Sequence, residues 1–173
     1  MPIGEQPTVT RGRLTVLSKG YSRVFMFNPP EVSDDKSVAY GTLSMPGASH
    51  PVIQYGSGGE RVISFQVYLD GDRGRYGREE QRVSISVEDH IRFYQSMLYP
   101  AELSMGDMKA VFPYLLLFNF GPLYRDVACV LKAAPLRVSY WSPHLEPVRA
   151  TMGLALSEVP ARTVTQADVF SLR

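Results

Sequence analysis

The alternation of apolar and polar residues is clearest near the end of the chain, between residues 147 and 158. Even-numbered positions from 148 to 156 are apolar, and odd-numbered positions are mostly polar or small. A period of two is typical of a strand with one buried face, because successive side chains in a strand point to opposite sides. The pattern predicts that the following residues of this strand pack into a core: Val148, Ala150, Met152, Leu154 and Leu156.

Further strands are predicted before this one. Residues 114–120 are almost entirely apolar and lie between proline and glycine, which favours a short strand buried on both faces. Residues 123–132 alternate, and we expect Leu123 to share a side with Cys129 while Tyr124 points the other way. Residues 136–140 repeat this alternation after Pro135. The region 112–158 therefore predicts the scaffold of the fold.

The first half of the chain predicts three more strands. Residues 13–17 and 23–27 form a strand pair around a turn at 19–22, and residues 61–69 form an amphipathic strand. The apolar face of that third strand consists of Ile63, Phe65, Val67 and Leu69.

One helix is predicted, and it begins after residue 86. Ser86 and Asp89 have the spacing of a capping box, and Val87, Ile91, Tyr94 and Leu98 recur at helical spacing. Pro100 is expected to end the helix.

Four stretches show no clear periodicity. Residues 31–55 contain several Pro, Gly and Asp breaks and predict a long irregular segment, which is either functional or ordered by neighbours. Residues 56–59, Gly-Ser-Gly-Gly, predict a flexible lead into the next strand. Residues 73–82 predict a charged, solvated loop, and residues 101–111 a connector.

These elements predict a mainly β protein with a single helix, an antiparallel barrel or sandwich flanked by that helix. We expect an N-terminal arm at residues 1–12, one β domain at 13–158 and a C-terminal tail at 159–173.

Charge and cysteine content reduce the number of functions that the chain could have. A net charge of +1 gives no electrostatic reason to expect a nucleic acid or a membrane surface as partner. Cys129 is the only cysteine, so no internal disulfide can form, and its place in an alternating strand predicts a buried structural thiol. The first residues lack the features of a secretion signal, so we expect folding in a reducing cytosol.

Candidate chemistry is sparse. His50, His90 and His144 lack metal-ligand spacing and are expected to be ordinary surface histidines. The Asp-Gly-Asp run at 70–72 resembles the start of a calcium loop, but Gly74 stands where a third oxygen ligand is needed. We therefore predict no catalytic, metal-binding or cofactor-binding residue, and no cofactor.

The loop after residue 71 is the best candidate for contact with a partner. Arg73, Arg75, Tyr76 and Arg78 are interleaved with glycines, and Arg and Tyr are favoured at protein interfaces. A plain solvated loop is the main alternative. Phosphate contact is a weaker one, because two glutamates follow at once.

Taken in order, several motifs resemble those of one family. They are Phe-Met-Phe-Asn-Pro-Pro-Glu at 25–31, Gly-Gly-Glu-Arg at 58–61 followed by Leu-Asp at 69–70, the helix end at 97–100, the strand 115–121, and Pro-Val-Arg-Ala at 147–150. This set is similar to the tube-like domain of baseplate adaptor proteins in contractile phage tails and related contractile injection systems. Many members also carry a LysM module. Only residues 159–173 follow the last strand here, so cell-wall binding is not carried over.

The resemblance implies a tail-tube-like fold and a structural, non-enzymatic role. It implies a homo-oligomeric six-fold ring between the central hub and the tail tube, in the baseplate of a virion tail assembled in the host cytoplasm. The expected partners are other hub and tube proteins, with no membrane and no sequence-specific nucleic acid. Met45 and His50 in the long segment 31–55 join the arginine loop as expected interface residues.

Two other kinds of function remain open besides a main tail-tube subunit. The many aromatic residues, 10 Tyr and 8 Phe, also fit a barrel that binds a small ligand. A hydrolytic pair made of Glu60 with Asp70 or Asp72 would need two carboxylates close together.

Overall fold

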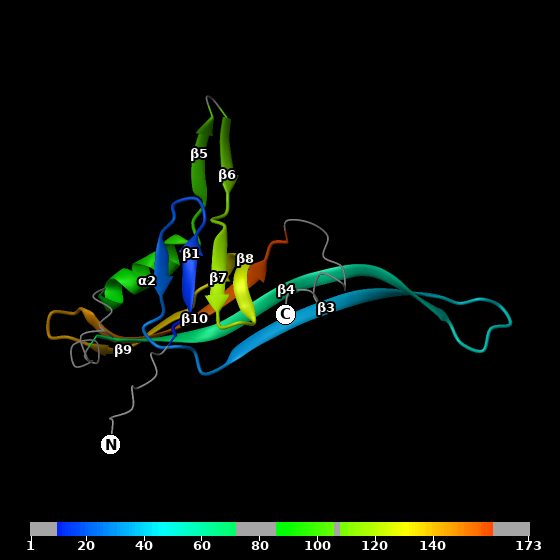
Figure 1. Cartoon of the computed structure of the whole chain (residues 1–173), viewed down its shortest axis with the longest axis horizontal. Helices are drawn as coiled ribbons and strands as arrows, with labels where there is room; N and C mark the ends of the chain where they lie inside the picture. Colours follow the sequence, from blue (N-terminus) through cyan, green and yellow to red (C-terminus); the bar gives the residue numbers. More distant parts are fainter. Residues whose placement is uncertain (1–9, 72–85, 106–107, 161–173) are drawn as a thin grey trace, which may run out of the picture.

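The computed structural model describes residues 10–71, 86–105 and 108–160, and is shown in Figure 1. These residues form a mainly antiparallel β structure with a single helix, which confirms the predicted fold class. The elements are β1 (Arg13–Val16), β2 (Ser22–Val24), β3 (Val32–Leu43), β4 (Val52–Asp70), α2 (Val87–Ser96), β5 (Ala101–Met105), β6 (Met108–Phe112), β7 (Leu116–Phe120), β8 (Tyr124–Ala133), β9 (Leu136–Trp141) and β10 (Pro147–Glu158).

One sheet has the strand order β2-β1-β7-β8-β10-β4-β3, and β5 and β6 form a separate hairpin. Strand β10 has two partners besides β4, because β9 pairs with its first half and β8 with its last residues. Strands β2 and β3 end the path without pairing to each other, so the described sheet is open and fits a sandwich. The closed-barrel form of the prediction is therefore not observed.

The core forms where the sheet curls over itself. Phe118 of β7 stacks on Phe65 of β4, with ring centroids 5.1 Å apart, although two strands separate β7 from β4 in the sheet. Phe25, which follows β2, lies 5.4 Å from Phe65. Burying each of these rings is worth about 1.5–3 kcal/mol relative to leaving it exposed, so this trio holds the two halves of the sheet together.

Strand β10 matches its prediction closely. Ala150, Met152, Leu154 and Leu156 are buried, and Leu154 lies opposite Phe65 in the ladder with β4. Strands β1 and β2 also form the predicted pair, slightly shortened.

Strand β8 departs from its predicted phase. Leu123 is exposed and Tyr124 is buried, the reverse of the expectation. The cause is an irregularity at Asp126, which has a φ of +49° beside a register shift in the pairing of β7 with β8. The Asp126 amide donates to Asn119 Oδ1 at 2.9 Å, which fixes this conformation. Strand β7 itself is fully buried on only one face, and its other face is half-buried.

Helix α2 begins as predicted, since the backbone amide of Asp89 donates to Ser86 Oγ at 3.1 Å. It ends at Ser96, earlier than Pro100, and Leu98 is exposed as a result. The expectation that His90 lies on the surface is wrong. Its ring is fully buried because it lies on the face of α2 that also buries Ile91 and Tyr94, and this helix packs on β10 and β4.

Three segments predicted to be irregular are strands instead. Most of residues 31–55 belongs to the hairpin of β3 and β4, the glycines at 56–59 lie inside β4, and residues 101–111 form most of the β5–β6 hairpin. Figure 1 shows both hairpins projecting from the body in different directions, with the β3–β4 hairpin reaching much farther. Strand β9 also exposes most of its residues, although its sequence alternates.

Candidate interaction surface

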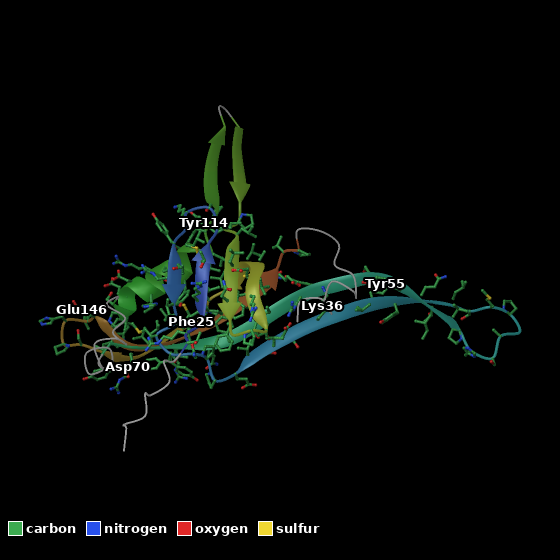
Figure 2. All side chains as sticks on the ribbon, in the orientation of Figure 1. Phe25, Lys36, Tyr55, Asp70, Tyr114 and Glu146 are labelled. Atoms are coloured by element: carbon green, nitrogen blue, oxygen red, sulfur yellow. The ribbon has the colours of Figure 1, made fainter. Side chains whose placement is uncertain are left out.

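The most distinctive feature of the molecule is the part of the β3–β4 hairpin that leaves the body. Strand β4 pairs with β10 from Val62 to Asp70, whereas its first half, residues 52–61, pairs only with β3 within the described part of the chain. We call residues 37–59 the arm. None of them is Asp, Glu, Lys or Arg, and nearly all are exposed. The side chains along the arm point into solvent in Figure 2.

One face of the arm is apolar. Tyr40 and Tyr55 lie opposite each other in the ladder and meet edge to face, with ring centroids 6.2 Å apart. They are 62% and 67% exposed. Strand alternation places Val38 and Ile53 on the same face, and both are exposed. The opposite face carries small or polar residues near the body and the exposed pair Leu43 and Val52 near the tip. An isolated two-stranded hairpin is marginal in water, so an apolar face of this kind favours contact with a partner.

The predicted interface residues Met45 and His50 lie at the tip of the arm, and both are exposed. A turn closes the tip, in which the Ala48 amide donates to the Met45 carbonyl at 3.1 Å and Gly47 has a φ of +83°. A positive φ is nearly free of strain only for glycine. The structure thus brings these two residues together at the tip.

The other predicted interface residues, Arg73, Arg75, Tyr76 and Arg78, lie outside the described residues, as do Asp72 and Gly74 of the calcium-like motif. Their roles stay predictions.

The glycines at 56–59 shape the arm where it leaves the body. The pairing of β3 with β4 shifts register twice, between Lys36 and Val38 and between Ala39 and Tyr40. Each shift leaves one extra residue in β4, which is the signature of a β-bulge. A side chain at Gly59 would place its Cβ only 2.2 Å from Ser37 Oγ and 3.1 Å from the Ser37 carbonyl oxygen. Gly56 similarly faces the Ala39 carbonyl oxygen at 3.0 Å, so close approach to β3 explains a glycine at positions 56 and 59.

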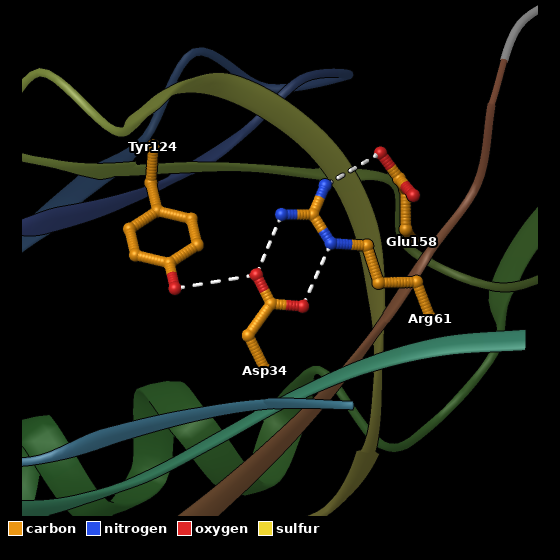
Figure 3. Close-up of polar contacts among 4 residues, drawn as sticks. All are labelled: Asp34, Arg61, Tyr124 and Glu158. Carbon is orange, nitrogen blue, oxygen red and sulfur yellow. Dashed lines mark hydrogen bonds and ion pairs between the residues drawn. The ribbon is translucent and has the colours of Figure 1, made fainter. Parts of the chain in front are cut away.

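A cluster of charged and polar side chains lies at the root of the arm (Figure 3). Arg61 of β4 donates to both carboxylate oxygens of Asp34 on β3, at 2.8 and 2.6 Å, and to Glu158 of β10 at 3.2 Å. The Tyr124 hydroxyl of β8 donates to Asp34 Oδ2 at 3.3 Å. Four strands therefore meet through four side chains, which we call the root cluster.

The electrostatics of the root cluster follow from these contacts. The hydrogen bonds from Arg61 hold the pKa of Asp34 below its usual range, and Asp34 in turn raises the pKa of Arg61. Burial, helped by the nearby Asp34 carboxylate, raises the pKa of Tyr124. All three groups therefore keep at neutral pH the charge states that their hydrogen bonds require.

A second ion pair lies nearby but is more exposed. Lys132 of β8 contacts both oxygens of Glu60 at 2.8 Å. The Lys132 hydrogen bond lowers the pKa of Glu60. Exposed pairs of this kind contribute little to stability, because water and salt screen the attraction between the charges.

The described residues give little support to catalysis or metal binding. Glu60 is paired with Lys132 and Asp70 with Arg149. Ten residues of one strand separate the two carboxylates, about 30 Å at the usual rise, which is too far for a hydrolytic pair. Within the described ranges no group of three or more His, Cys, Asp and Glu side chains could hold a metal ion, and no helix could span a membrane. Cys129 is buried as predicted, and burial raises the pKa of its thiol to about 12.

A shallow groove of about 460 Å³ lies on the solvent side of the central strands. Its lining includes Ser64, Gln66 and Tyr68 of β4 and Gly153 and Ala155 of β10. The groove is open and lined by small and mixed side chains, so it does not resemble the enclosed apolar pockets that hold small ligands.

Sequence reasoning missed the arm and its root cluster. A signal for the hairpin was present, since the β-prone runs 38–43 and 52–55 flank a turn sequence rich in Pro and Gly. The apolar residues of those runs are exposed, so they show no alternation with a buried face. The pairing of Arg61 with Asp34 joins residues far apart in sequence and has no local signature.

These observations describe a class of protein: an open antiparallel β scaffold whose most distinctive surface is an uncharged hairpin suited to contact with other proteins. Residues 14–167 match the family model of the contractile injection system tube protein. The chain belongs to this family, which confirms the resemblance seen in its motifs.

Other comparisons add little. A search against solved structures matches the crystal structure of the Dit (gp 19.1) protein of phage SPP1, described as a paradigm of the hub adsorption apparatus in phages that infect Gram-positive bacteria. That match has a TM-score of 0.46 and 16% identity, and it covers 86% of this chain and 50% of the other. The chain thus spans half the length of the matched structure. Comparison with curated proteins gives no match.

Proposed function

We propose that this chain is a non-catalytic structural subunit that assembles with copies of itself into a ring in a contractile tail or injection machine. The ring joins the baseplate hub to the tail tube, and the hub and tube proteins are its other partners. Membership in the tube protein family supports a structural tail role. The observation that carries the proposal is the arm, whose exposed apolar face has no use in an isolated subunit.

The open sheet supports assembly in the same way. Strand β3 is an edge strand of twelve residues, with one side unpaired among the described residues. A long free edge is a template for pairing with another chain, and natural proteins usually cover such edges. A ring built by heterologous contacts would cover the edge and the arm of each subunit with the next subunit.

The decisive experiment counts copies of the chain in purified, density-banded particles by quantitative mass spectrometry, relative to a known tube subunit. About six copies, or a small multiple, would support a closed ring at the baseplate. Hundreds of copies would make the chain a main tube subunit. If no copies were found, the tail role would be wrong.

A variant experiment tests the arm itself. Tyr40→Asp together with Tyr55→Asp should leave the body folded and prevent incorporation into particles, because charges on an apolar contact face are costly to bury. Tyr21→Asp is the matched control, since Tyr21 is similarly exposed on the body. Equal incorporation of the arm variant and the control would remove the arm from the interface.

The arginine loop is a second proposed contact. Reversing Arg73, Arg75 and Arg78 to glutamate should damage assembly and leave the fold intact. Normal incorporation of that variant would remove the loop from the interface.

A further inference from the structure

The root cluster lies where the pairing of β4 with β10 ends. The last β4 residue paired with β10 is Val62, opposite Ser157. The next residue toward the tip is Arg61, which pairs only with Lys36 of β3. Beyond this point the arm is a two-stranded ribbon, and such ribbons twist and bend easily.

Arg61 reaches back across this boundary. Its guanidinium group binds Asp34 of β3, which lies opposite Ile63 on the body side of the boundary, at 2.6–2.8 Å, and Glu158 of β10 at 3.2 Å. Tyr124 supplies a second link, because its hydroxyl joins Asp34 to β8. A planar fork with two parallel hydrogen bonds fixes orientation as well as distance. The root of the arm is therefore held to β10 through Glu158 and to β8 through Tyr124.

The partly buried state of the cluster separates it from ordinary surface ion pairs. The side chains of Arg61, Asp34 and Glu158 are only 27%, 25% and 23% exposed. Lys132 and Glu60 also link β8 to the arm root, but their side chains are 50% and 43% exposed. Hydrogen bonds that are less accessible to water are less easily exchanged for water contacts, so the root cluster holds its geometry more strongly.

We infer that Arg61, Asp34, Glu158 and Tyr124 act as an orientation clamp, which sets the angle at which the arm leaves the body. The inference rests on the proposed function for its use, since a fixed angle presents the arm to a neighbouring subunit without an ordering cost at assembly. The clamp residues are positioning residues and do not themselves need to touch the partner.

The test measures the arm in single chains. Spin labels at Ala48→Cys on the tip and Ser18→Cys on the body report a distance distribution by pulsed electron resonance, and both positions are exposed. Dilution into excess unlabelled chain removes distances between subunits. The buried Cys129 thiol reacts poorly with the label.

Replacing Arg61 with glutamine should about double the width of the tip-to-body distribution, as expected when a hinge loses its fixing contacts. Lys132→Gln is the matched control and should leave the width unchanged. An unchanged width in a folded Arg61→Gln chain would overturn the clamp. Should Arg61→Gln fail to fold, Asp34→Asn takes its place with the same two outcomes, and circular dichroism reports folding.

The clamp and the proposed function fail in different ways. A distribution that broadens as expected would support the clamp even if particles contain no copies of the chain. An unbroadened distribution would remove the clamp and leave the copy number in particles as the separate measure of the tail role.

Discussion

Strand β4 is continuous, but one half lies in the body and the other half is exposed to solvent. From Val62 to Asp70 the strand pairs with β10, and as far as Phe65 also with β3, and it buries Ile63, Phe65, Val67 and Leu69. From Val52 to Arg61 it pairs on one edge only, and almost every residue is exposed. The body half alternates between apolar and polar residues, and the arm half does not. Alternation of apolar and polar residues therefore indicates that one face of a strand is buried. A strand exposed on both faces lacks this pattern and cannot be predicted from it.

The largest expected effect comes from placing a charge in the core next to the body half of β4. Leu154→Asp, opposite Phe65, should abolish soluble folding. The free energy needed to bury an unpaired carboxylate exceeds the free energy of unfolding of most domains. Soluble expression and circular dichroism measure the result. Gln66→Asp is the control, since Gln66 is exposed on β4, and should remain folded. A folded Leu154→Asp chain would show that the assigned core face is wrong.

The next effect comes from a buried group in the body. His90 is buried on the inner face of α2, and neither ring nitrogen has a hydrogen-bond partner in the described part of the chain. Burial, with a smaller contribution from Arg23, lowers its pKa to about 4, and Asp89 acts in the opposite direction. The unfolded chain takes up this proton near pH 6.5. Stability should therefore fall as the pH is lowered from 6.5 toward 4, by up to about 3 kcal/mol, and should not change for this reason above pH 6.5.

Urea denaturation at several pH values measures this effect. His90→Phe should lose the part of the pH dependence that belongs to His90, and His50→Gln should keep it because His50 is exposed. Identical pH profiles for the wild-type and His90→Phe chains would contradict the prediction.

A smaller and local effect is expected in the arm. Gly59→Val should destabilise the root of the arm by about 1–3 kcal/mol, because the new side chain would collide with Ser37. Hydrogen exchange should accelerate in the arm and remain slow in β10 and the body half of β4. Gly41→Ala is the control, since the space around Gly41 is open. Equal protection of the arm in both variants would show that the bulged glycines are not required.

The smallest effect on stability is expected from substitutions on the exposed face of the arm. Tyr40→Ser with Tyr55→Ser should change the free energy of unfolding of the isolated chain by no more than about 0.5 kcal/mol, since both rings lie in solvent. Chemical denaturation measures it. A large loss of stability would mean that the arm supports the body.

The sequence predicts the body well and the arm poorly, for physical reasons. Leu154 and Phe65 lie in patterns created by a single buried face, and the cap of α2 is a local hydrogen bond. The reversed phase at Tyr124 depends on the irregular conformation of Asp126, which alternation does not report. The burial of His90 depends on how α2 packs. The pairing of Asp34 with Arg61 depends on strand register, which a local pattern does not encode.

The division of the chain at residues 12 and 158 stays a prediction, as do the roles of the arginine loop. Met45 and His50 are described, and their position at the tip is compatible with the interface role proposed for them. A motif resemblance located the family before any contact was known, because motifs preserve order along the chain. It did not reveal the arm, whose exposed surface is the main structural support for assembly.

The absence of charged residues from the arm has a kinetic consequence. Oppositely charged surfaces attract each other over a distance and can raise association rates to about 10⁸–10⁹ M⁻¹s⁻¹, whereas uncharged surfaces meet at about 10⁵–10⁶ M⁻¹s⁻¹. In the proposed assembly, an arm without charged residues gives no long-range electrostatic guidance toward a partner. For contact through the arm alone, the association rate should depend on subunit concentration and change little with ionic strength, whereas the proposed contact of Arg73, Arg75 and Arg78 should add a part that falls with added salt. Timing of assembly would then be governed by how many subunits the cell has made.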